Sequence, residues 1–199
     1  MVVVGHHTGA ILGPLGEVGT TRWADWIEIP LPYAVVGCAV GAFLAAGVRG
    51  RAWLVLAAAA VAYTQGQGIH LAANSIANDA PGDAAHLWDE VVGHYFWYGG
   101  LAGIVAGLAL GLGGLPRPAG PFRHVLAVLF GFTAFTNFVE GGTAVLGLVT
   151  SLAFVVWGFR QRGRAGELLI PTYVIATVGL VAWGVYWRGW PQFSELDWF

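Results

Sequence analysis

The chain has 199 residues, of which 57% are hydrophobic and only 10% are charged, and its formal net charge is −2. Soluble domains usually carry about a quarter charged residues, so this composition is typical of a protein embedded in a membrane. The single cysteine, Cys38, excludes a disulfide framework and a cysteine-based zinc site. The sequence also has no glycine-rich phosphate loop and no broad basic surface, so we expect neither a soluble nucleotide-dependent enzyme nor a nucleic-acid-binding protein.

Short breaks rich in glycine and proline divide the chain into six apolar segments. Each is close to the roughly 20 residues that a helix needs to cross a bilayer, and backbone groups in lipid must be paired within such helices. We therefore expect an all-α, polytopic membrane protein that forms a single domain, 1–199, with six transmembrane helices. Their expected ranges are 29–48, 52–74, 88–112, 122–140, 143–159 and 168–187.

Arginine predicts how these helices are oriented. Seven of the nine arginines lie in the connections between expected helices 1 and 2, 3 and 4, or 5 and 6, or at the adjoining helix end, and Glu167 alone among the eleven acidic residues lies on that side. Connections rich in arginine usually face the cytoplasm, so we expect a protein of the cytoplasmic membrane with both termini outside. Residues 23–28, Trp-Ala-Asp-Trp-Ile-Glu, predict a short interfacial helix on the outer leaflet before the first span.

Polar side chains gather at the outer ends of expected helices 2, 3 and 4. On helix 2, four residues are spaced four, three and four apart and therefore share one face: Tyr63, Gln67, His70 and Asn74. Their phenol, amide and imidazole groups descend toward the outer surface. The topology places this stripe in the same leaflet as the polar ends of the next two helices.

The third and fourth expected helices bring carboxylates to the same end. Glu90 and His94 are four residues apart on one face, and Tyr98 lies one turn deeper. Asp89 points about 100° away from this face, near the helix N-terminus, where a carboxylate is favourable. Helix 4 adds a stripe of three residues, Thr133, Asn137 and Glu140.

These polar ends predict a metal site. Ionisable groups in a bilayer are costly unless they are paired or bind an ion, and a carboxylate and a histidine on one helix facing a second ligand-bearing helix recur in metal-binding bundles. The expected ligands are His70, Glu90, His94 and Glu140. Imidazoles and carboxylates suit zinc, iron or manganese, and we expect zinc first. The structural alternative is an ion pair between Glu90 and His94 that locks helix 3, with Asn74 as a cap of helix 2.

A metal-bound water would give this site a nucleophile, because the ion lowers the pKa of the water towards about 7. We expect Glu140 or Asp89 to act as the general base. Asn74, Asn137 or Tyr98 would orient the substrate or stabilise an oxyanion. Which carboxylates bind the ion and which act as base depends on helix rotation, which residue spacing does not fix.

Four positions at this end, His70, Ser75, Asp89 and His94, resemble the zinc-binding set of histidine, aspartate and serine in the membrane hydrolases grouped with alkaline ceramidases and adiponectin receptors. The resemblance covers only these positions. That group has seven helices and a His-xxx-His pair on the last one, whereas residues 168–187 contain no histidine. The resemblance implies a metal-dependent hydrolase that acts on a lipid or amphipathic substrate.

Two other functions stay open. The stripe on helix 2 would suit cation transport or sensing, although the cytoplasmic half of the bundle is nearly all alanine, valine, leucine and glycine, which disfavours a pore. An accessory subunit of a membrane complex is suggested by glycines at every fourth position, Gly99, Gly103, Gly107 and Gly111. Such a strip lets another helix approach closely, either in the same chain or in a second copy or partner. The sequence also leaves open whether His6 and His7 add a ligand.

Overall fold

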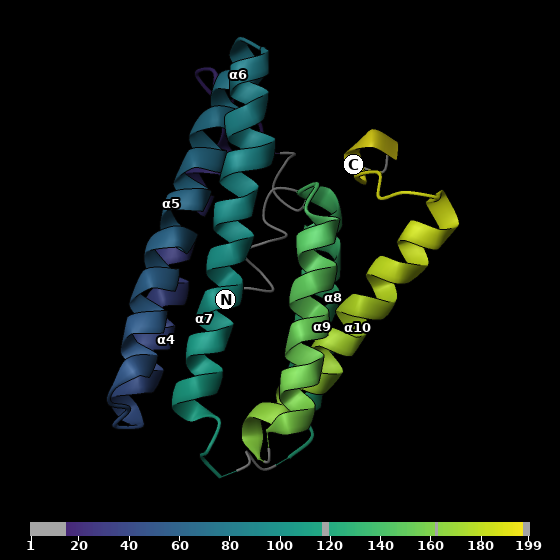
Figure 1. Ribbon diagram of the computed structural model, residues 1–199. Coiled ribbons are helices and arrows are strands. Elements are labelled where there is room, and N and C mark those ends of the chain that lie inside the picture. The colour runs from purple at the N-terminus through teal and green to yellow at the C-terminus, as the bar shows by residue number, and fades with distance from the viewer. Residues whose placement is uncertain (1–14, 117–119, 162, 197–199) are drawn as a thin grey trace.

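The computed structural model describes residues 15–116, 120–161 and 163–196, and most of these residues are helical (Figure 1). A short antiparallel pair, β1 (Glu17–Val18) and β2 (Thr21–Arg22), precedes the helices. The helices are α3 (Trp23–Glu28), α4 (Leu31–Ala45), α5 (Arg51–Asp79), α6 (Asp83–His86), the π-helix η2 (Leu87–Gly93), α7 (His94–Leu112), α8 (Phe122–Glu140), α9 (Ala144–Arg160), α10 (Arg164–Trp187) and the 3-10 helix η3 (Ser194–Leu196). The expected all-α fold is confirmed for this part of the chain.

Four helical stretches are long and apolar enough to cross a membrane, namely Trp23–Ala45, Asp83–Leu112, Phe122–Glu140 and Arg164–Trp187. The apolar helix α9 is shorter, at 17 residues. Helix α5 has 29 residues and is long enough, but Gln65, Gln67 and His70 lower its hydropathy. The protein is therefore all-α and suited to a membrane, while six spans, the sidedness of the loops and the outside termini stay predictions.

Each of the six expected segments overlaps one long observed helix, and the segment 88–112 also includes most of the π-helix η2, but some bounds differ. Helix α5 continues five residues beyond the expected end at Asn74, to Asp79, because polar residues can extend a helix past its apolar stretch. It ends shortly before Pro81, which disfavours the helical conformation in the residue preceding it. Helix α10 begins four residues earlier than expected, directly after Gly163, whose φ of 124° is a backbone conformation that favours glycine. The helix expected at 23–28 is present as α3.

The long helices form two groups of three (Figure 1). In one group α4, α5 and α7 lie together, with the most extensive contact between α5 and α7; in the other, α10 packs against both α8 and α9. Contacts between the groups are fewer and come mainly from α7, which meets α9 and α10 and, through Tyr98 and Phe138, α8. The C-terminal ends of α5 and α8 lie at the same end of the bundle as α6, and the start of α5 at Arg51 lies at the other.

Glycines allow α5 and α7 to approach closely. A side-chain Cβ at Gly66 of α5 would collide with the backbone of Trp97 in α7, and a Cβ at Gly100 of α7 would collide with the backbone of Tyr63 in α5. Helices that meet through small residues bring their backbones close together. The two helices therefore face one another backbone to backbone near the polar end of the bundle.

The glycine strip expected from the sequence lies on α7 and is mostly covered by other helices of the same chain. A Cβ at Gly103 or Gly107 would meet Ala59 or Leu56 of α5, and one at Gly111 would meet the ring of Phe43 in α4. Gly99, in contrast, is exposed, and a Cβ added to it would meet no atom within 4 Å. Three of the four glycines thus serve packing within the chain, and association with a second copy or another protein stays a prediction.

This packing predicts opposite effects for two neighbouring substitutions. Gly100→Ala should lower the melting temperature of the detergent-purified protein, because overpacking costs about 1–3 kcal/mol and the Tyr63 backbone cannot rotate away. Gly99→Ala should leave the melting temperature unchanged or raise it, since alanine favours a helix over glycine by up to about 1 kcal/mol and meets no atom there. Equal destabilisation by both substitutions would contradict the assigned contact between α5 and α7.

Candidate metal centre

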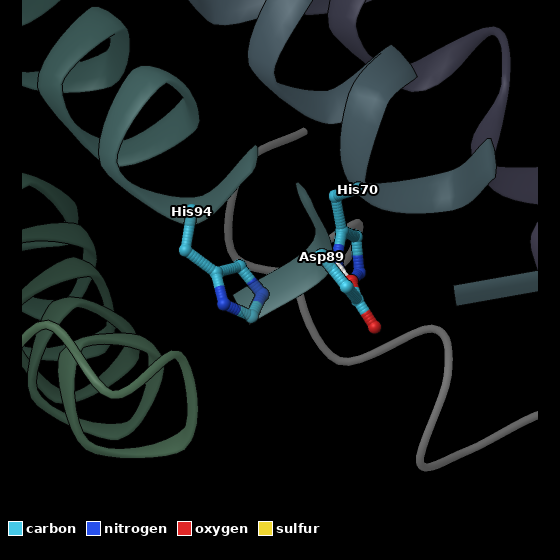
Figure 2. Close-up of side chains that lie close together, drawn as sticks. All are labelled: His70, Asp89 and His94. Carbon is cyan, nitrogen blue, oxygen red and sulfur yellow. Dashed lines mark hydrogen bonds and ion pairs between the residues drawn. The ribbon is translucent and has the colours of Figure 1, made fainter. Parts of the chain in front are cut away.

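Three side chains from three helical elements converge at the polar end of the first helix group (Figure 2). His70 comes from α5, Asp89 from the π-helix η2, and His94 is the first residue of α7. Each offers one ligand atom, and these atoms all lie within 4.8 Å of one another. Asp89 and His94 are buried, and His70 is half-buried. This His70–Asp89–His94 cluster could hold a metal ion.

The π-helix brings Asp89 to the cluster. Residues five apart, such as Asp89 and His94, diverge on an α-helix, where successive residues turn by about 100°. In a π-helix the hydrogen bonds run from i to i+5, so residues five apart come close to the same face. The expectation that Asp89 points away from His94 assumed α-helical spacing and was wrong for that reason.

His70 and Asp89 form a direct contact between α5 and η2. The His70 Nδ1 and Asp89 Oδ1 atoms are 2.5 Å apart. Gly93 makes this approach possible, because a Cβ at this position would lie 3.0 Å from the backbone of His70. The pair removes a carboxylate and an imidazole from solvent together, which is how buried ionisable groups are normally accommodated.

His94 is the most enclosed of the three, with 5% of its surface exposed. Its Nδ1 atom is 3.4 Å from Glu90 Oε2 and forms no hydrogen bond within the described residues. Figure 2 shows a ring nitrogen of His94 on the side of His70 and Asp89, and the His70 and His94 ring centroids are 4.5 Å apart. With Nδ1 beside Glu90, the Nε2 atom of His94 is the one available to an ion.

Aromatic rings line the cluster on the α7 side. Trp97 stacks on His70 with a centroid distance of 5.1 Å, and Tyr98 stacks on His94 at 5.5 Å. Both rings are buried. Such an apolar wall restricts water and strengthens electrostatic interactions inside the site. Trp97 was not singled out from the sequence, because an aromatic residue in an apolar helix is ordinarily a packing residue.

The two other expected ligands have different partners. Glu90 Oε2 accepts a hydrogen bond from Gln192 Nε2 at 2.9 Å. Glu140 Oε2 accepts hydrogen bonds from the backbone N–H groups of Phe193 at 2.7 Å and Ser194 at 3.3 Å. Glu90 thus borders the cluster through His94, whereas Glu140 contacts the C-terminal segment. Of the four expected ligands, His70 and His94 lie in the cluster together with Asp89, and the ligand roles expected of Glu90 and Glu140 stay predictions.

The expected orienting residues are dispersed around this end of the bundle. Tyr98 and Asn137 line a small cavity of about 20 Å³ among α7, α8, α9 and α10, large enough for a single water molecule. Asn74 is half-buried on α5, one turn beyond His70. Ser75 Oγ is 3.5 Å from Asp25 Oδ2 and so faces α3, outside the metal cluster. The roles expected for these residues stay predictions, and His6 and His7 lie outside the described residues.

The donor set suits a divalent transition metal. Two imidazoles and a carboxylate are ligands for zinc, iron or manganese. Ligand atoms of a tetrahedral zinc ion at 2.0–2.2 Å lie about 3.3–3.6 Å apart, so atoms within 4.8 Å of one another would bind one ion after side-chain rotation. Three protein ligands also leave one position of a tetrahedral ion open.

Comparison of the chain with protein-family models, with curated proteins and with solved structures finds no match. The function is therefore inferred from the site.

The His70–Asp89 contact predicts a stability effect that needs no metal. Asp89→Ala should lower the free energy of unfolding by about 1–3 kcal/mol in chelator-treated protein, because a half-buried imidazole loses its partner. Asp79→Ala, at the exposed end of α5, is the matched control and should change the free energy of unfolding little. The measurement is denaturant unfolding in detergent. Equal effects of the two substitutions would show that the His70–Asp89 contact does not stabilise the fold.

Proposed function

We propose that this protein is an integral-membrane metalloprotein that holds one divalent transition metal ion between His70, Asp89 and His94. The observation that carries this proposal is the convergence of three ligand atoms from α5, η2 and α7 within 4.8 Å of one another. A buried carboxylate and two imidazoles are costly in an apolar bundle unless they are paired or bind an ion. An ion bound by all three satisfies this requirement for the whole cluster.

We further propose metal-dependent hydrolysis as the reaction. Catalytic zinc sites commonly have three protein ligands and an open fourth position for water, and the ion supplies a nucleophile by lowering the pKa of that water. The His70–Asp89–His94 cluster likewise offers three protein ligands. Within this proposal His70, Asp89 and His94 are ligands, and Trp97 and Tyr98 keep the surroundings of the site apolar.

The surroundings of the site support a lipid or amphipathic substrate. Large apolar side chains on the outer faces of η2 and α7 are exposed beside the ligands: Leu87, Trp88, Val91, Tyr95 and Phe96. These residues lie in Asp83–Leu112, a stretch long and apolar enough to cross a membrane. Exposed apolar side chains of this kind face lipid in a membrane protein. A substrate with an acyl chain would therefore approach the site from the bilayer.

The proposal also includes the orientation of the protein in the membrane. We infer six spans with the arginine-rich connections in the cytoplasm, which places the metal site at the outer face of the membrane. A single cysteine introduced at Asp83 in a Cys38→Ala background should react with an impermeant maleimide added to intact cells. A cysteine introduced at Gly120 should react only after the cells are opened. The reverse pattern would overturn this orientation.

Metal analysis of the detergent-purified protein tests the central proposal. Wild type should contain a near-stoichiometric transition metal, and His70→Ala and His94→Ala should lose it, because each removes a ligand. His86→Ala and His124→Ala are matched controls, since both histidines lie outside the cluster and should leave the metal content unchanged. Wild type that binds no metal, even after reconstitution with zinc, iron or manganese, would overturn the metal centre.

Hydrolysis needs its own assay. Metal-loaded wild type should release fatty acid or headgroup from ester- or amide-linked lipids in mixed micelles, and His94→Ala should not, while the control His86→Ala should keep the activity. Stoichiometric metal without cleavage of either lipid class would overturn the hydrolase and favour cation sensing or transport by the same cluster.

A further inference from the structure

The chain after α10 turns back over the polar end of the bundle. Arg188, in the left-handed region with φ of 55°, ends α10 and redirects the chain. The indole N–H of Trp190 donates to the Leu180 carbonyl at 2.9 Å, and that of Trp183 donates to the Pro191 carbonyl at 3.0 Å. We call residues 190–196 the C-terminal strap. These bonds fix the strap to the end of α10.

The strap is also fixed to α8. Phe193 is buried and packs edge-to-face against Phe135 and Trp183, and the backbone N–H groups of Phe193 and Ser194 donate to Glu140. Charge-assisted bonds to a carboxylate are stronger than neutral ones. The strap is thus a well-anchored part of the second helix group.

From this anchored position the strap reaches the first helix group. Gln192 Nε2 donates to Glu90 Oε2 at 2.9 Å, and Gln192 is itself held by a hydrogen bond from its backbone N–H to Glu195 Oε2 at 3.0 Å. The same Glu90 oxygen is 3.4 Å from His94 Nδ1. A continuous row of polar groups therefore runs from the strap to a residue of the metal cluster.

The contact between Glu90 and His94 is the one in this row that a bound metal ion would change. His94 Nδ1 is buried and lacks a hydrogen bond within the described part of the chain. A metal-binding histidine almost always donates its other ring N–H to a carboxylate or carbonyl, which fixes the tautomer and the ring orientation and raises the basicity of the ligand nitrogen. Glu90 is the carboxylate beside this nitrogen.

We propose, resting on the metal centre above, that Glu90 and Gln192 are positioning residues: Gln192 of the C-terminal strap holds Glu90 in place, and Glu90 accepts the Nδ1 proton of His94 so that Nε2 faces the ion. The affinity of the site then depends on a segment nearly 100 residues away from it in the sequence. Binding of the ion would also tie the two helix groups together, because the hydrogen bond from His94 to Glu90 continues through Gln192 to the C-terminal strap.

Titration of metal-free, full-length protein with Co²⁺, followed by its visible absorption, tests this proposal. Glu90→Gln should weaken Co²⁺ binding by about 10–100-fold, the usual effect of removing an outer partner, and should shift the absorption bands because the basicity of His94 falls. Gln192→Ala should weaken binding several-fold. Ser194→Ala is the matched control, since the backbone rather than the hydroxyl of Ser194 contacts Glu140, and it should change neither affinity nor spectrum.

A double variant separates positioning from a general loss of structure. If Gln192 acts through Glu90, Glu90→Gln with Gln192→Ala should bind Co²⁺ no more weakly than Glu90→Gln alone, because residues of one network do not contribute additively. Melting temperatures of all variants show that each is folded. Wild-type affinity and spectrum in folded Glu90→Gln would overturn the positioning role while leaving the metal centre intact, whereas wild type that binds no Co²⁺ would overturn both.

Discussion

The close approach of α5 and α7 is the constraint on which the candidate metal centre depends. Side chains of His70, Asp89 and His94 are short, and they converge only because Gly66, Gly93 and Gly100 let the two backbones meet. In a membrane the hydrophobic effect does not hold helices together, so packing between small residues supplies much of their association. The same contact thus stabilises the first helix group and brings the three candidate ligands together.

Much of this arrangement is predictable from sequence. Apolar length and glycine–proline breaks give six helices in the right places, and residue polarity identifies the end of the bundle at which His70 and His94 meet. The sequence could not place Asp89 beside His70 and His94, because the adjacent acidic residues at 89 and 90 differ only in which face they occupy. That choice depends on a π-helical segment, which has no signature in residue spacing.

The positions of Glu90 and Glu140 illustrate a second limit of periodicity. Both lie at the expected end of the bundle, but their partners are Gln192, Phe193 and Ser194. Nothing in the local pattern around either glutamate points to a segment 50 to 100 residues further along the chain. Contacts of this kind follow from how the chain turns after α10, and therefore from the tertiary fold rather than from helical spacing.

The π-helix also bears on how such a site can arise. Hydrogen bonds from i to i+5 take up one more residue per turn than those of an α-helix, so the segment from Leu87 to Gly93 is equivalent to an α-helix with one inserted residue. If the same residues formed a regular α-helix, Asp89, five positions before His94, would turn away from that residue. Whether Asp89 joins the cluster therefore depends on the backbone hydrogen-bond pattern of this segment, which a change of side chain at His70 or His94 would leave in place.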